Sequence, residues 1–191
     1  EYNQQDTLHN LIIKDINLDS TDVLLENSVD MGGNSANWQF DNSPVARAFY
    51  YDNDNSQVNP HWDELDNWKN PDTSSNSQPG SLTPATRLPL PIDNVIFDSI
   101  SFKNNDTIFL EDELFYCKDL YCFDMETYST TPVMMMLNAE LLVNGSMYME
   151  ENMTMDFDDM GHDEEDQGII FTSDNNETIR TAVEEWLDDF K

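Results

Sequence analysis

The sequence has few basic residues, few cysteines, few glycines and no long apolar run. Eight Lys and Arg stand against 39 Asp and Glu, which gives a formal net charge of -31 at pH 7. A field of this sign repels phosphate backbones and anionic lipid, so we expect neither nucleic acid nor a membrane as a partner. No stretch approaches the roughly 18 apolar residues of a membrane-spanning helix. Cations, basic proteins and neutral glycans remain as possible partners.

Catalytic motifs are also missing. The three histidines, His9, His61 and His162, stand in unrelated polar settings, and the sequence has no HExxH and no Gly-x-Ser-x-Gly. With 6 glycines, the chain has little material for a loop that cradles phosphate. Carboxylate pairs are abundant, so a polysaccharide hydrolase or lyase stays open as a less favoured alternative. We therefore expect a protein that is not an enzyme.

The two cysteines, Cys117 and Cys122, are too few for a metal site, which needs more ligands. A redox CxxC pair has a shorter spacing. A local disulfide is favoured over two free buried thiols, and it would place the chain in an oxidising compartment. The chain begins at Glu1 without a signal peptide, as a secreted product or an expressed fragment would. We expect a secreted protein, outside the cell or on its surface.

Short stretches of alternating apolar residues predict strands, both before Met31 and after Val95. The most regular stretch has four apolar pairs at a six-residue period: Met135 and Leu137, Leu141 and Val143, Met147 and Met149, Met153 and Met155. A buried pair on a short strand, followed by a corner, is typical of a hexapeptide-type β-helix or of intertwined β-fibres. An ordinary β-meander is the alternative, but its turns vary in length.

The predicted fold is mainly β: a β-solenoid or solenoid-like sandwich with long loops and one C-terminal amphipathic helix. Residues 1–69 form an N-terminal β segment with loops, and residues 70–92 a connector rich in Pro and Ser. Residues 93–157 form the solenoid-like region, and residues 158–191 an acidic loop and the helix. The helix is predicted from apolar residues spaced by three and four: Ile179, Ala182, Val183, Trp186, Leu187 and Phe190.

Two kinds of modification or binding site follow from local motifs. Four Asn-x-Ser/Thr acceptors for N-glycosylation occur, at Asn105, Asn144, Asn152 and Asn176. Asp52 and Asp54 alternate with amides as in calcium loops, although a solvated turn is the commoner outcome. The methionines are expected to fill the core rather than bind copper. We expect no cofactor beyond a weakly bound calcium ion, and glycans attached covalently.

Three stretches resemble known extracellular proteins. Trp62 to Trp68, then Pro84 to Pro91 and Asp93 to Phe97, resemble the lead-in of many extracellular β-helix surface proteins, in which tryptophans cap the first coil. Leu141 to Met149 resembles the strand-turn units of fibre and tail-spike β-solenoids. Ile170 to Trp186 is similar to the helix that opens BspA-like surface repeat regions. These resemblances imply extracellular surface architecture and carry no catalytic residue.

The function expected from these features is structural. The chain would be a self-assembling subunit of a secreted, glycosylated filament, flagellar hair or surface layer, because open strand edges give a route to polymerisation. A glycan-binding adhesin module is the alternative, with Trp38, Trp62 and Trp68 stacking on sugar rings.

Overall fold

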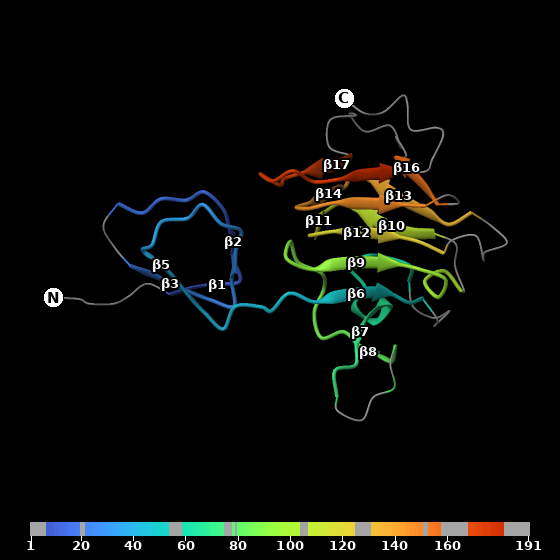
Figure 1. Ribbon diagram of the computed structural model, residues 1–191, viewed down its shortest axis with the longest axis horizontal. Coiled ribbons are helices and arrows are strands. Elements are labelled where there is room, and N and C mark those ends of the chain that lie inside the picture. The colour runs from blue at the N-terminus through green and yellow to red at the C-terminus, as the bar shows by residue number, and fades with distance from the viewer. Residues whose placement is uncertain are drawn as a thin grey trace. The chain divides into compact units, whose positions relative to one another are not determined.

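The computed structural model describes residues 7–19, 22–53, 59–74, 78, 80–103, 107–124, 131–150, 153–157 and 168–181. Strands dominate these residues, which confirms the predicted mainly β class. Their one helical element is a short 3-10 helix, Leu65–Asn67 (η1). No helix within these ranges is long and apolar enough to cross a membrane. The chain divides into two compact units, residues 1–46 and 47–191 (Figure 1).

The first unit consists of very short strands that pair in parallel. A three-stranded sheet has the order β1-β3-β5, and β2 pairs with β4. Their bounds are β1 (Thr7–His9), β2 (Ile12–Ile13), β3 (Val23–Glu26), β4 (Val29–Asp30) and β5 (Trp38–Asp41). Parallel neighbours cannot be joined by a tight hairpin, so the chain returns to the same side before each new strand. Ile13, Leu25 and Val29 form its buried interior.

Asparagines turn the corners of this unit. Asn10, Asn27 and Asn42 follow β1, β3 and β5 and have φ of 57°, 50° and 52°. Asparagine tolerates this left-handed conformation better than other residues with a Cβ. The side-chain amide of Asn27 donates to Oδ1 of Asn10 at 2.5 Å, across 17 residues of sequence. Successive corners therefore stack and bond to each other.

The second unit contains three sheets. A seven-stranded sheet has the order β18-β15-β12-β9-β6-β7-β8, and two three-stranded sheets have the orders β10-β13-β16 and β11-β14-β17. All their pairings are parallel except β6 with β7 and β7 with β8. The bounds are β6 (Ala48–Tyr51), β7 (Trp68–Pro71), β8 (Leu82–Pro84), β9 (Asn94–Phe97), β10 (Thr107–Glu111), β11 (Leu114–Cys117), β12 (Leu120–Cys122), β13 (Val133–Leu137), β14 (Glu140–Val143), β15 (Met147–Met149), β16 (Thr154–Phe157), β17 (Gly168–Phe171) and β18 (Ile179–Thr181).

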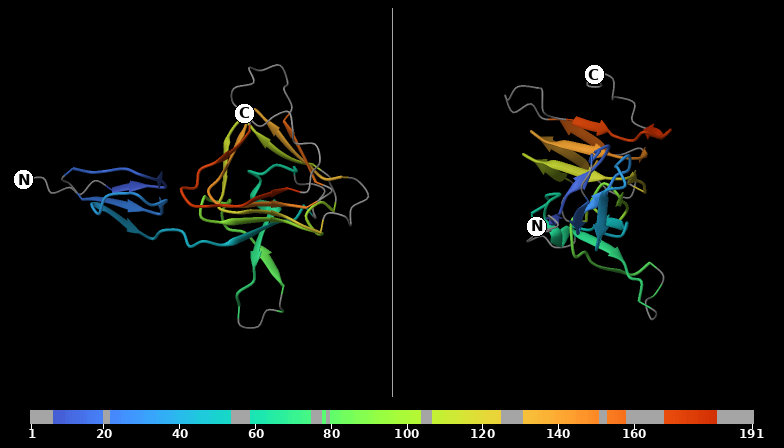
Figure 2. Two further views of the ribbon diagram at one scale, coloured as in Figure 1. Left: turned by 45° about the horizontal axis from the view of Figure 1, so that its top comes forward. Right: turned by 90° about the vertical axis from the view of Figure 1, so that its left-hand side faces the viewer.

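Consecutive strands visit the three sheets in turn. The strands β10, β11 and β12 lie in three different sheets, and β13, β14 and β15 then pair with them in the same order. We call each such set of three strands a coil; the last coil is β16, β17 and β18. Residues 26 positions apart, such as Asp112 and Asn138, thus become neighbours. Figure 2 shows the three ladders around a common interior.

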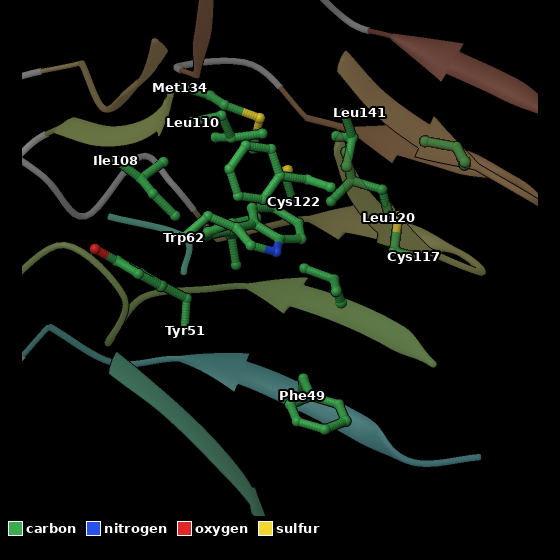
Figure 3. Packing of buried hydrophobic residues seen from close by; sticks show 14 of the residues in the cluster. Phe49, Tyr51, Trp62, Ile108, Leu110, Cys117, Leu120, Cys122, Met134 and Leu141 are labelled. Atoms are coloured by element: carbon green, nitrogen blue, oxygen red, sulfur yellow. The ribbon is translucent and has the colours of Figure 1, made fainter. Parts of the chain in front are cut away.

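The interior is filled by alternate residues of each strand. In β14 and β15 the buried side chains are Leu141, Val143, Met147 and Met149, as the six-residue period predicts. Figure 3 shows the interior packing around Trp62, Leu110, Leu120 and Met134. Each inward side chain packs on its counterparts in the neighbouring coils, because the register keeps equivalent residues together.

One pair of the predicted period has the opposite orientation. Met134 and Met136 are fully buried, whereas Met135 and Leu137 face outward and are half-buried. All five residues of β13 are apolar, so alternation alone could not select the inward set. The register with β10 selects it, because Ile108 lies beside Met134 and Leu110 beside Met136. Met153 is buried as predicted, and Met155 is half-buried.

The C-terminal helix was predicted to include Ile179, and this part of the prediction is wrong. Ile179–Thr181 form β18, which pairs in parallel with β15. Two of its three residues are β-branched, and pairing with an existing edge outweighs the helical spacing. The remaining predicted helix, residues 182–191, and the acidic stretch 158–167 lie outside the described residues. β8 also forms within residues 70–92, where a connector was predicted.

A corner of the second unit allows a direct test of the stacked geometry. Asn138 has φ of 51°, and its side-chain amide donates to Oδ1 of Asp112 at 3.0 Å. We expect Asn138→Ala to be about 1 kcal/mol less stable than Asn138→Gly, because alanine is strained at positive φ. Chemical denaturation followed by circular dichroism measures the difference.

Glu113 supplies the control for this comparison, because it is exposed and is not among the residues with positive φ. At Glu113 we expect the opposite order of stability. Glu113→Gly should be less stable than Glu113→Ala, since glycine loses more conformational entropy on folding. An alanine variant at Asn138 as stable as its glycine counterpart would contradict the corner geometry.

Candidate functional site

A column of polar residues turns the corner before four strands of the seven-stranded sheet. Asp93, Asp119, Ser146 and Thr178 immediately precede β9, β12, β15 and β18. The Asp119 carboxylate accepts from the Ser146 N–H at 2.7 Å, and the Thr178 N–H donates to Ser146 Oγ at 3.1 Å. Ser146 Oγ also donates to Glu177 at 2.8 Å. Each coil is therefore bonded to the next through side chains as well as through the backbone.

Asp93, the first residue of the column in chain order, is completely buried and paired with Arg87. Its carboxylate accepts from both terminal nitrogens of Arg87 and from the backbone N–H groups of Arg47 and Leu90. The Arg87 guanidinium also lies 5.0 Å from the centroid of the Phe49 ring. A buried carboxylate with this many donors fixes the path of the chain into β9.

Three tyrosines and one isoleucine form a column along the outer face of the same sheet, which we call the aromatic column. The register places Tyr50 beside Ile96, Ile96 beside Tyr121, and Tyr121 beside Tyr148. The Tyr121 and Tyr148 rings are stacked, with centroids 5.3 Å apart and planes 1° apart. Burial raises the pKa of the Tyr121 phenol, and the charges of Asp119 and Tyr148 raise it further. Both rings point away from the interior, so this pair adds nothing to the packed core.

At one end of the interior, the last coil is the outermost layer among the described residues. The strands β16, β17 and β18 each end their sheet, and among the described residues no strand pairs with their far edges. Ile179 is 52% exposed, whereas its register partner Met147 is 0% exposed. Other inward residues of this coil, Ile169 and Phe171, are half-buried against the core. This end, which we call the open end, presents three adjacent edges and apolar side chains.

The opposite end of the interior is covered by the chain itself. There β7 and β8 continue the sheet in antiparallel fashion beyond β6. Trp62 and Trp68 pack edge to face at 5.0 Å, and the Trp68 indole N–H donates to the Trp62 carbonyl at 2.6 Å. Both rings are buried, at 2% and 0% exposure, so they close this end. The two ends of the second unit therefore differ in character.

The burial of these rings bears on the glycan-binding alternative. Trp62 and Trp68 were expected to be exposed in that alternative, and the structure contradicts this. Trp38 in β5 is half-buried, with its indole N–H donating to the Ile16 carbonyl at 3.0 Å. Two of the three tryptophans proposed to stack on sugars thus have no face open to a ligand.

The glycosylation acceptors differ in their settings. Asn176 and Thr178 are exposed in the segment before β18. Asn144 is half-buried, and its side-chain oxygen accepts from Thr172 at 3.4 Å. The next residue is Gly145, where a Cβ would meet Asp119 Oδ1 at 2.3 Å. Asn105 and Asn152 lie outside the described residues. Asn176 is accordingly the acceptor with the most open surroundings among those described.

The structure has Cys117 and Cys122 as free, buried thiols, so the predicted disulfide is not formed in it. Cys117 belongs to β11 and Cys122 to β12, and both side chains point into the interior. Because the chain turns a corner between these strands, each sulfur packs within its own ladder, beside Val143 or Met149. Burial raises the pKa of both thiols; for Cys117 the charges of Asp119 and Cys122 add to the effect.

One of the two proposed calcium residues, Asp52, lies within the described part of the chain. Asp52 is buried, with one carboxylate oxygen 3.7 Å from the Lys103 ammonium, and Asp54 lies outside the described residues. The part of the chain that the structure describes contains no group of three or more His, Cys, Asp or Glu that could hold a metal ion. The structure thus gives Asp52 a cationic neighbour from its own chain.

Comparison with known proteins adds no relative. No protein-family model, no curated protein and no solved structure matches this chain. Sequence reasoning missed the aromatic column and the polar corner column, although a signal for both is present. Tyr121 and Tyr148 occupy equivalent positions one coil apart, and so do Asp119 and Ser146. These pairs can be recognised in the sequence only once the number of residues in one coil is known.

The thiols provide a prediction. Because a raised pKa keeps a thiol protonated at pH 8, and the thiolate is the reactive form, we expect both cysteines to react slowly with a thiol reagent in the native chain. In denaturant without reductant, both should react at once. Absorbance of the released chromophore measures the rates. Absence of reactive thiol in denaturant would reveal a disulfide, and rapid native reaction would contradict the buried placement.

Proposed function

We propose that this chain is a non-enzymatic structural subunit of a secreted, glycosylated filament or surface layer, and that its second unit is a β-solenoid that assembles through its open end. The observation that carries the proposal is the contrast between the two ends of the coiled interior. At one end Trp62 and Trp68 cover the interior, whereas at the other end, among the described residues, β16, β17 and β18 end their sheets and Ile179 is 52% exposed.

The parallel register supports the solenoid part of the proposal. Three ladders advance together, side chains alternate between interior and exterior, and corners repeat at equivalent positions. In such an architecture each coil buries its apolar side chains against its neighbours, so a terminal coil needs a cover. The buried tryptophans also fit the resemblance to extracellular β-helix proteins, in which tryptophans cap the first coil.

Strand addition needs a backbone edge with donors and acceptors and an apolar contact, and the open end has both. The far edges of β16, β17 and β18 offer backbone donors and acceptors, and Ile169, Phe171 and Ile179 offer apolar contact. Because Trp62 and Trp68 cover the interior at the opposite end, the open ends of two copies join head to head.

A filament requires a second contact, and the first unit offers one. Its outer strands β1 and β5 end the three-stranded sheet. Among the described residues, five exposed large apolar side chains belong to this unit: Leu8 at 42%, Leu11 at 36%, Ile12 at 40%, Ile16 at 41% and Val45 at 73%. A subunit with one such surface on each unit is bivalent, which is the minimum for a linear polymer.

Charge regulates this assembly. A net charge of -31 makes copies repel each other, and the repulsion is screened within about 10 Å at 0.1 M salt. Association therefore strengthens as salt is added, and divalent cations act at lower concentration. Glycans at exposed acceptors such as Asn176 keep neighbouring filaments apart.

The test is a pair of matched substitutions on neighbouring edge strands. Ile179→Glu places a charge beside the interior at the open end, whereas Ile170→Glu places it on the outer face of β17. We expect Ile179→Glu to abolish head-to-head association, because burying an unpaired carboxylate is costly, and Ile170→Glu to leave it intact. Sedimentation velocity over a range of concentration and salt, with negative-stain microscopy, measures the result.

Two outcomes would overturn the proposal. One is a native chain that stays monomeric at every concentration and salt. The other is equal association of Ile179→Glu and the native chain, which would show that copies meet elsewhere. Circular dichroism of both variants confirms that each substitution leaves the strands folded.

A further inference from the structure

The stacked tyrosines on the outer face have no part in the core or in the open end. Tyr121 and Tyr148 are register partners on β12 and β15, with parallel rings 5.3 Å apart between centroids. Both side chains are half-buried and face outward. Two phenols are thus held face to face at the surface, on strands that belong to successive coils.

We propose that Tyr121 and Tyr148 are a site of oxidative cross-linking, at which a dityrosine bond joins two successive coils. The oxidant is hydrogen peroxide, and a haem peroxidase that accepts surface phenols uses it to oxidise the two tyrosines. The proposal does not depend on self-assembly, because both tyrosines belong to one chain.

The chemistry is a two-electron oxidation shared between the rings. Each phenol loses one electron and one proton, and the two phenoxyl radicals couple through ring carbons adjacent to the C–O carbons. The hydrogens on these carbons move to the oxygens, which restores both aromatic rings. Peroxide takes up the two electrons and two protons and becomes two molecules of water. The product is a biphenol that has lost two hydrogen atoms.

The geometry favours coupling within this pair. Neighbouring strands lie about 4.8 Å apart, so the two rings start side by side and bond formation needs only side-chain rotation. The other described tyrosines have different neighbours. Tyr51 is fully buried, Tyr116 lies beside Leu142, and Tyr50 is separated from Tyr121 by the strand that carries Ile96.

The bond would staple the fold at a place where the chain has no disulfide. It joins residues 27 positions apart at equivalent places on β12 and β15, and the Asp119 to Ser146 hydrogen bond joins the preceding corners over the same separation. A carbon–carbon bond resists reducing agents, so this staple persists where a disulfide would open.

The experiment treats the full chain with hydrogen peroxide and a haem peroxidase at low protein concentration. After denaturation, a protease that cleaves after glutamate separates Tyr121 from Tyr148, because Glu126 and Glu140 lie between them in the sequence. We expect one joined pair of peptides, lighter by two hydrogens, together with dityrosine fluorescence. Tyr121→Phe and Tyr148→Phe should each reduce this product to background while keeping the ring stack.

Tyr116→Phe is the matched control, since it removes an outward tyrosine that has no tyrosine partner in the register. It should leave the yield of the joined peptides unchanged. Dityrosine found only between chains, or an equal yield in Tyr121→Phe, would overturn the proposal. Unchanged circular dichroism of each phenylalanine variant ensures that a lost product reflects the lost phenol.

Discussion

The parallel register between successive coils determines which side chains of the second unit are buried and which face outward. It places Leu120 beside Met147 and Cys122 beside Met149 in the interior, and Tyr121 beside Tyr148 outside. A shift of one residue would exchange these two sets and turn the apolar side chains to water. Burial of the inward set therefore holds the register, and the register in turn creates the stacked corners and the outer columns.

At the corners, this register requires particular types of residue. At one corner the chain needs a left-handed residue, and Asp112 and Asn138 supply it with φ of 54° and 51°. At another, Gly145 must lack a Cβ because the Asp119 carboxylate occupies that space. The acidic residues are thus of two kinds. Some, such as Asp93 and Asp119, are buried parts of the scaffold, and others contribute to the net charge that opposes association.

The sequence predicted the mainly β class and the inward set of β14 and β15, because Leu141, Val143, Met147 and Met149 alternate with residues of different character. It could not orient Met134 to Met136, where neighbours are equally apolar and only the partner strand decides. Ile179 satisfied a helical spacing locally, yet it pairs with β15. The aromatic column and the open end arise from residues far apart in sequence, so no local pattern contains them. Their positions depend on the number of residues in one coil, and the six-residue period of the apolar pairs does not reveal that number.

The most direct test of the register is a pair of double-cysteine variants in a background with Cys117 and Cys122 replaced by alanine. Leu114 and Glu140 are register partners on β11 and β14, whereas Leu142 lies two residues further along β14. Neighbouring strands are about 4.8 Å apart, within the Cα separation that a disulfide spans, and an offset of two residues exceeds it. We expect Leu114→Cys with Glu140→Cys to form a disulfide under mild oxidation, and Leu114→Cys with Leu142→Cys to form none. Equal cross-linking of the two pairs, or cross-linking of the second pair alone, would contradict this register.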